Sequence, residues 1–220
     1  MNIDATGIAL LIIVCIVLPY LAIQTARRLG NLALPMPRRA FYIQTIGFQL
    51  FLFAAAVYAS HTNGIALFRA ANLRGWIAAA AFVVIAFAVL LIRWPHRTAD
   101  SKARLVRLLP QNRSEIPLYL LVCVVAAVVE EVVYRGATYG LLLKLTSSMA
   151  IVIAVCAIAF ALGHVIQGWQ SVAAILIFAI GFHAIVIIAN SLWPAIAAHF
   201  VYDVIAGILI PTLDSRNEPC

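Results

Sequence analysis

Seven apolar runs, each close to the length of a membrane-spanning helix, dominate this chain. At 1.5 Å of rise per residue, about 20 residues cross the roughly 30 Å hydrocarbon core of a bilayer. The runs fall near residues 6–23, 41–60, 76–92, 117–134, 148–163, 170–189 and 192–210. The chain has 220 residues, of which 65% are hydrophobic and 10% are charged. A soluble domain of this size could not bury so much apolar surface, so the expected solvent is lipid.

Lipid as a solvent leaves few possible folds, because backbone amides and carbonyls in hydrocarbon must be hydrogen-bonded within the protein. The apolar runs are continuous and do not alternate with polar residues, which excludes a β-barrel. We therefore predict an all-α, polytopic membrane helical bundle with about seven transmembrane helices. One or two of these spans could merge or be half-helices.

The net charge of +7 would suggest a nucleic-acid partner in a soluble protein. Here the basic residues gather in two predicted loops. The first loop contains Arg27, Arg28, Arg38 and Arg39, and the third contains or borders Arg93, Arg97, Lys102, Arg104, Arg107 and Arg113. Cytoplasmic loops carry an excess of Lys and Arg, so we expect the amino terminus outside and both loops in the cytoplasm. Membrane lipid is the expected partner of these charges, and nucleic acid is not.

A long polar connection over residues 93–117 separates two predicted domains. Residues 1–116 hold amino-terminal transmembrane helices and a basic cytoplasmic loop, and residues 117–220 form a membrane-embedded helical core. Within apolar segments or at their edges, ionisable side chains occur in the second part: Glu130, Glu131, Arg135, His164, His183, His199 and Asp203. We therefore expect function in residues 117–220 and a packing role for the first three helices.

Glu130, Glu131 and Arg135 stand inside one of the most apolar runs of the chain. An ionised group in hydrocarbon costs roughly 2.5 kcal/mol or more, so three within six positions need partners or a use. On a helix Glu131 and Arg135 are i and i+4 and can pair, while Glu130 points about 100° away. We predict that Arg135 neutralises Glu131 and that Glu130 faces a cavity. An ion pair that only joins helices is the structural alternative.

The depth of Glu130 depends on where its helix ends. No proline interrupts the sequence between Ala137 and Thr146, so we expect the helix to continue past Gly136 toward Lys144. This would place Glu130 near mid-membrane, close to His164, in a cavity that opens toward the cytoplasm.

The histidines fall on three other segments. His164 ends an apolar run, with Phe160 one turn earlier, and His199 has Asp203 four residues later on the same helical face. Each of these patterns also has a structural explanation, such as a carboxylate that fixes a histidine tautomer. We interpret His183 as a helix–helix hydrogen bond, with a smaller chance that it lines the site.

Together, Glu130, His164, His199 and Asp203 have the groups that water activation requires. A general base takes the proton, and histidines hold the water or the developing oxyanion. There is neither an HExxH motif nor a Gly-x-Ser-x-Gly elbow, so a soluble zincin and a serine hydrolase are not indicated. The cofactor stays unknown: Glu130, His164 and His199 could hold a divalent metal such as zinc or a metal-free water.

The spacing of these residues resembles the CPBP family of intramembrane proteases, also called the CAAX-protease or bacteriocin-processing (Abi) family. The family motifs EExxxR, FxxxH and HxxxN or HxxxD appear here as EEVVYR from Glu130, FALGH from Phe160 and HFVYD from His199. The resemblance covers about residues 117–210. It implies an endopeptidase that cuts a peptide or membrane-protein substrate at or within the bilayer.

By the same resemblance, Glu130 with His164 would activate the water and His199 with Asp203 would stabilise the oxyanion. Glu131 and Arg135 would form the supporting ion pair. Eukaryotic members trim prenylated carboxy termini, and bacterial members are often tied to bacteriocin immunity or processing. We therefore expect a multi-pass protein of the bacterial inner (plasma) membrane.

Two other function classes fit part of the pattern. A non-catalytic immunity factor or scaffold could use the same buried network for structure alone. A proton-coupled transporter also uses intramembrane Glu, His and Asp, but it would more often show internal pseudo-symmetry. The confinement of these groups to one half of the chain counts against the transporter.

Overall fold

The computed structural model describes residues 3–29 and 36–215, in which helices are connected by turns and loops and no strand occurs. The ends of the two predicted domains, residues 1–2 and 216–220, lie outside this description. The α-helices are α1 (Ala5–Ile12), α2 (Leu18–Leu29), α3 (Arg38–Thr62), α4 (Leu73–Arg93), α5 (Ala99–Leu108), α6 (Ile116–Glu130), α7 (Tyr139–Thr146), α8 (Met149–Gly163), α9 (Trp169–Ala189) and α10 (Trp193–Ser215). The π-helical segments are η1 (Ile13–Val17) and η3 (Glu131–Thr138), and the short 3-10 turns are η2 (Arg113–Glu115) and η4 (Val165–Gln167).

Six continuous helical rods are long and apolar enough to cross a membrane. They are Ala5–Leu29, Arg38–Thr62, Leu73–Arg93, Arg113–Thr146, Trp169–Ala189 and Trp193–Pro211. The α8 helix is equally apolar but shorter. The predicted all-α, polytopic bundle with about seven spans is therefore confirmed, with α8 as the short member.

The fourth rod runs without a break from Arg113 to Thr146, over 34 residues. The expected continuation of this helix past Gly136 is confirmed, and α7 ends only where Ser147 adopts a left-handed conformation with φ of 53°. Glu130 lies 17 positions after Arg113 and 16 positions before Thr146. The carboxylate therefore stands at the middle of the longest helix in the described chain.

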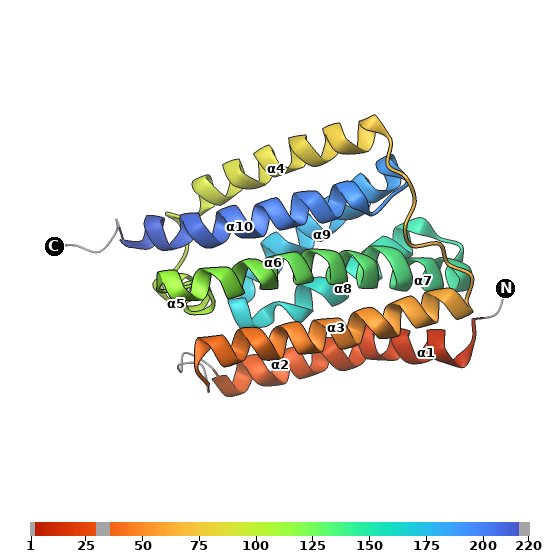
Figure 1. Ribbon diagram of the computed structural model, residues 1–220, viewed down its shortest axis with the longest axis horizontal. Helices are drawn as coiled ribbons and strands as arrows, with labels where there is room; N and C mark the ends of the chain where they lie inside the picture. The colour runs from red at the N-terminus through yellow and green to blue at the C-terminus, as the bar shows by residue number, and fades with distance from the viewer. Residues whose placement is uncertain (1–2, 30–35, 216–220) are drawn as a thin grey trace.

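This long rod is also the centre of the bundle (Figure 1). It packs between α3 on one side and α10 on the other, and α8 packs against α9 behind it. The α4 helix covers α9 and α10, and α1 and α2 run beside α3 and α8. Residues on η3 are consequently surrounded by protein on all sides.

The end of α2, the start of α3, α5 and the carboxy-terminal end of α10 lie at one end of the bundle (Figure 1). Arg38 Nη1 is 3.2 Å from Glu115 Oε2, and the hydroxyl of Tyr42 donates to the carbonyl of Leu108 at 3.0 Å. These contacts join the start of α3 to the connection between α4 and α6. The direction in which this end faces across a bilayer stays a prediction.

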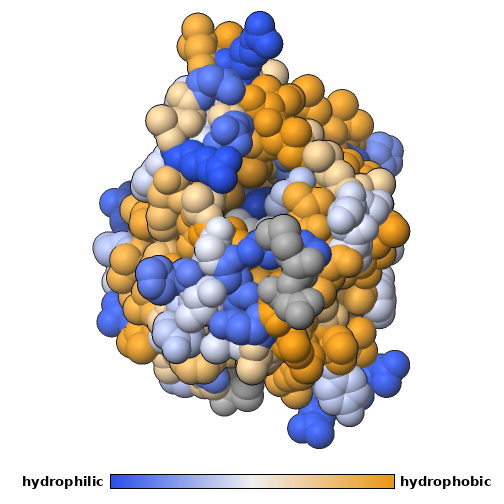
Figure 2. Space-filling model, turned by 90° about the vertical axis from the view of Figure 1, so that its right-hand side faces the viewer, coloured by the Kyte–Doolittle hydropathy of each residue, from blue (hydrophilic) through white to orange (hydrophobic). Residues whose placement is uncertain are grey.

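The sides of the bundle expose large apolar side chains. Phe51, Val84 and Ile177, each near the middle of a long helix, are 64%, 69% and 63% exposed. Figure 2 looks onto the end of the bundle near the amino terminus, where hydrophilic residues gather on the end face and hydrophobic residues flank them. Apolar sides with polar ends are the distribution that a surrounding bilayer favours.

Candidate active site

A change of helix type separates the two adjacent glutamates. Glu130 is the last residue of α6, and Glu131 is the first residue of the π-helix η3. A π-helix forms i→i+5 hydrogen bonds and has a wider turn, and such segments occur frequently at functional sites. Arg135, four residues later in η3, places Nη1 3.2 Å from Glu131 Oε1. The ion pair expected from the spacing is therefore present.

This ion pair is fully enclosed, with both side chains at 0% exposure. Arg135 donates no well-aligned hydrogen bond to Glu131, and its guanidinium instead lies 4.2 Å from the centre of the Phe160 ring and 5.3 Å from that of Phe182. A cation over an aromatic face gains about 2 kcal/mol or more when both are desolvated. The aromatic rings of α8 and α9 thus supply part of the stabilisation that water would give to an exposed arginine.

Glu131 also fixes the orientation of His199 on α10. The distance from His199 Nδ1 to Glu131 Oε1 is 2.9 Å, across 68 positions of sequence. A carboxylate beside an arginine is ionised and only accepts, so Nδ1 carries the proton and donates. The ring of His199 is also stacked on Phe182, with ring centres 5.1 Å apart. Its other nitrogen, Nε2, is therefore held toward Glu130.

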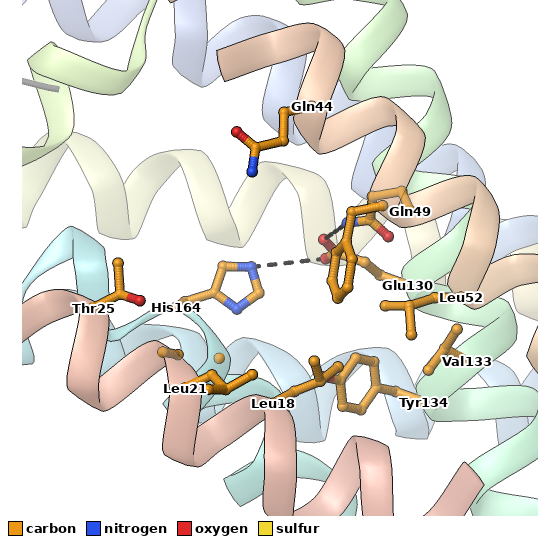
Figure 3. A pocket seen from close by; sticks show the side chains of 13 residues that line it. Leu18, Leu21, Thr25, Gln44, Gln49, Leu52, Glu130, Val133, Tyr134 and His164 are labelled. Atoms are coloured by element: carbon orange, nitrogen blue, oxygen red, sulfur yellow. Dashed lines mark hydrogen bonds and ion pairs between the residues drawn. The ribbon is translucent and has the colours of Figure 1, made fainter. Parts of the chain in front are cut away.

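The carboxylate of Glu130 has one engaged oxygen and one open oxygen. Gln49 on α3 donates from Nε2 to Oε1 at 2.7 Å. The second oxygen, Oε2, is 3.7 Å from His164 Nε2 and 3.8 Å from His199 Nε2. Figure 3 shows Gln49 and His164 approaching Glu130 from different sides. Both distances to Oε2 exceed a direct hydrogen bond, and a single water molecule can bridge such gaps.

His164 presents its Nε2 atom to Glu130 because its other nitrogen is already used. It lies just after α8, and its Nδ1 is 2.8 Å from the carbonyl oxygen of Phe160. A carbonyl only accepts, so Nδ1 carries the proton. In a neutral ring Nε2 is then an acceptor that can receive a hydrogen bond from water.

Asp203 lies on the far side of His199. Its Oδ2 is 3.5 Å from His199 Nε2, and its side chain keeps 31% exposure. The hydroxyl of Tyr119 on α6 donates to the backbone carbonyl of Asp203 at 3.0 Å, which attaches this part of α10 to the central rod. His199 Nε2 therefore stands between the carboxylates of Glu130 and Asp203.

The structure thus brings Glu130, His164, His199 and Asp203 together around one point, although their catalytic roles stay a prediction. The interpretation of His183 as a helix–helix hydrogen bond is wrong within the described residues. Its Nδ1 bonds the carbonyl of Ala179 on its own helix at 2.9 Å, and its Nε2 has no hydrogen-bond partner. The carbonyl four residues earlier is within reach of the imidazole, so the proton is satisfied locally.

Gln49 is the residue that the sequence analysis missed. Gln49 lies on α3, within residues 1–116, for which a packing role was expected. The helix packs against α6, and one amide group reaches the carboxylate. The available signal was a pair of uncharged polar residues, Gln44 and Gln49, within an apolar run. Neither side chain is ionisable, so the pattern of ionisable residues within apolar runs does not include them.

Two cavities meet at Glu130. The first, of about 460 Å³, lies between α2, α3 and the end of α8, with Leu18, Leu21 and Thr25 on one side and Gln44 and Leu52 on the other (Figure 3). The second, of about 350 Å³, extends among α3, α5, α6, α9 and α10. The residues that line both cavities are Gln49, Glu130 and His164. The open oxygen of Glu130 can therefore be approached from two directions.

The same residues do not form a metal site in this arrangement. Among residues 3–29 and 36–215, no group of three or more His, Cys, Asp or Glu is placed to hold a metal ion. Two ligands on one tetrahedral zinc, at about 2.0–2.1 Å each, lie roughly 3.4 Å apart. The separations of Glu130 Oε2 from His164 and His199, 3.7 and 3.8 Å, are wider.

Comparison with known proteins gives a match over these residues. The model of the family described as Rce1-like, type II CAAX prenyl endopeptidase, matches residues 112–205. Residues 112–205 therefore resemble the Rce1-like family. The match contains all three motifs and confirms the resemblance to the CAAX-protease family. No curated protein and no solved structure matches the chain.

The Rce1-like family and the apolar rods together establish the class of protein. The chain is an integral, multi-pass membrane protein. The match to a CAAX prenyl endopeptidase family supports a membrane peptidase that acts on a peptide or protein.

Replacement of Arg135 tests the buried ion pair. We expect Arg135→Ala to lower the free energy of unfolding by about 3–5 kcal/mol, because Glu131 would remain buried without its partner. Thermal unfolding of the detergent-solubilised protein would measure the change. Asp100→Ala is the matched control, since it removes an i,i+4 pair with Arg104 in which the carboxylate is 47% exposed, and it should cost about 1 kcal/mol or less. Equal stability losses in both variants would contradict this account.

Proposed function

We propose that this Rce1-like protein is an intramembrane endopeptidase that hydrolyses a peptide bond near the carboxy terminus of its substrate. The observation that carries the proposal is the position of Glu130 Oε2, which faces two imidazole nitrogens at 3.7 and 3.8 Å in a wall shared by two cavities. A carboxylate and two imidazoles around a water-sized gap are the groups that general-base hydrolysis uses.

In this mechanism, a water molecule sits between Glu130 Oε2 and His164 Nε2. Glu130 takes one proton as the water oxygen attacks the scissile carbonyl carbon, and His164 accepts a hydrogen bond from the second proton. The resulting tetrahedral intermediate collapses when the carbon–nitrogen bond breaks. The proton held by Glu130 then passes to the departing amine, so that the carboxylate is regenerated.

His199 is the group placed to stabilise the oxyanion of this intermediate. Its Nδ1 proton is committed to Glu131, so only a protonated Nε2 can donate to the oxyanion. Three carboxylates surround the ring, those of Glu130, Glu131 and Asp203, and they balance a positive charge there. In this arrangement Asp203 stabilises the positive charge on His199, so that an ionised Asp203 does not have to contact the oxyanion itself.

We place the protein in the inner (plasma) membrane of a bacterium. We place the basic loops in the cytoplasm because the charge distribution follows the positive-inside bias. A role in bacteriocin immunity is a further function that the family resemblance implies. If the protein is instead a non-catalytic immunity factor or scaffold, its cellular phenotype would not depend on the open oxygen of Glu130.

Glu130→Gln tests the proposed base directly. The amide keeps the size of the carboxylate but cannot take a proton, so we expect cleavage to fall by about 10²–10⁴-fold or more. The assay is mass-spectrometric detection of the shortened product from a prenylated peptide with a CAAX carboxy terminus. A thermal unfolding midpoint near that of the wild type would verify folding. Cleavage at the wild-type rate would refute the assignment.

The metal-free form of the mechanism has its own test. We expect purified, active protein to contain no stoichiometric zinc by elemental analysis, and its activity to survive prolonged exposure to EDTA and phenanthroline. The reason is that no group of three or more His, Cys, Asp or Glu side chains is placed to hold a metal ion among residues 3–29 and 36–215. Loss of activity in chelator, followed by recovery on addition of one metal ion, would overturn this part.

Gln49 should act as a positioning residue. By holding Oε1, it directs Oε2 toward the histidines, and a hydrogen bond to a charged group contributes about 1.5–3 kcal/mol. We expect Gln49→Leu to lower kcat by about 10–100-fold with little change in KM. Gln44→Leu is the matched control, because Gln44 lies on the same helix and lines the first cavity but has no hydrogen bond to Glu130. Equal effects of the two substitutions would refute the role.

A further inference from the structure

An arginine, Arg97, lines the second cavity. Arg97 lies in the turn between α4 and α5 and is half-buried, and no other Lys or Arg is among the lining residues. The same cavity is lined at its other end by Glu130, His199 and Asp203. One continuous space therefore connects the proposed catalytic carboxylate with a guanidinium.

Arg97 is held in place by neutral partners. Its Nη1 donates to the hydroxyl oxygens of Ser101 at 2.8 Å and Ser171 at 3.1 Å. Both serines are buried, and the Ser171 hydroxyl donates onward to the carbonyl of Gln167 at 2.8 Å, which leaves its oxygen free to accept. These contacts occupy one nitrogen of the guanidinium and fix its orientation.

No carboxylate in the described ranges forms an ion pair with Arg97. The acidic residues nearest in sequence have other partners, because Asp100 pairs with Arg104 and Glu115 pairs with Arg38. Burial lowers the pKa of Arg97, although a guanidinium stays protonated at neutral pH. A half-buried cation with unused donors and no counter-ion is suited to an anionic ligand, since charge-assisted hydrogen bonds to carboxylates are among the strong ones.

The length and walls of the cavity limit what that ligand can be. Ser171, which contacts Arg97, and Phe182, which stacks on His199, are eleven positions apart on α9. At 1.5 Å per residue this is about 16 Å, which an extended peptide covers with about five residues. Between these levels the cavity is lined by Ala174, Ile175 and Phe178. An anionic group at Arg97 could thus belong to a short peptide with aliphatic side chains.

We propose that Arg97 binds the carboxylate at the carboxy terminus of the peptide substrate, while the scissile bond lies at Glu130. This assignment rests on the proposed function and adds to it a rule for substrate choice. The enzyme would require a free carboxy terminus and would release a fragment of no more than about five residues. Arg97 would act as a binding residue that sets the distance from the chain end to the cut.

Two versions of one peptide test this rule. The probe is a prenylated peptide with a CAAX carboxy terminus, made once as the free acid and once as the amide. We expect wild-type kcat/KM to be about 10–100-fold higher for the acid, mainly through KM. Arg97→Gln should lower cleavage of the acid to the rate of the amide, and Arg97→Lys should recover part of it, since lysine retains the charge without the planar fork. Arg93→Gln, which changes an exposed neighbour outside the cavity, should preserve the preference for the acid.

Binding to the Glu130→Gln protein separates this proposal from the peptidase itself. We expect that protein to bind the fluorescent acid probe at least tenfold more tightly than the amide, and the Arg97→Gln substitution to remove the difference. Equal binding and equal cleavage of both probes would overturn the carboxylate site and leave the peptidase standing. Acid-selective binding without any Glu130-dependent cleavage would overturn the peptidase and leave the site standing. If anionic lipid vesicles displace both probes equally and only through Arg97, the residue binds a headgroup and the proposal is wrong.

Discussion

The site depends on a buried carboxylate that is shared between an arginine and a histidine. Glu131 contacts Arg135 at 3.2 Å and His199 at 2.9 Å in full enclosure. Desolvation of such charges costs several kcal/mol per ion, and only close partners offset it. The contact with His199 joins the central rod to α10 and fixes which ring nitrogen carries a proton. Without it, His199 Nε2 would have no defined direction, and Glu130 would lose one of its two facing imidazoles.

The two adjacent glutamates are used in opposite ways because one residue of helix rotation separates their environments. Glu131 is enclosed by aromatic rings and charged partners, whereas Glu130 lies in the wall between two cavities. Gln49 engages one oxygen of Glu130 and leaves the other open. A satisfied ion pair thus lies beside an available base, and the first provides the rigid support that the second needs for directed proton transfer.

The cavities connect this chemistry to the membrane position of the protein. Exposed apolar sides hold the bundle in lipid, and the central rod places Glu130 at its midpoint. The second cavity extends from that point to Arg97, in the basic connection between α4 and α5. A substrate that is itself part lipid-soluble and part charged could therefore occupy apolar and polar regions at once.

The sequence alone determined the class of fold and the local pairs. The lengths of the apolar runs predict which segments can cross a membrane. Helical periodicity brings Glu131 to Arg135 and His199 to Asp203, because each pair is four residues apart on one helix. Tertiary packing decided the rest: that Gln49 on α3 reaches Glu130, that His199 turns Nδ1 to Glu131, and that His183 bonds its own helix. Contacts between helices depend on crossing positions and on which nitrogen or oxygen is already satisfied, and neither is encoded in spacing along one helix.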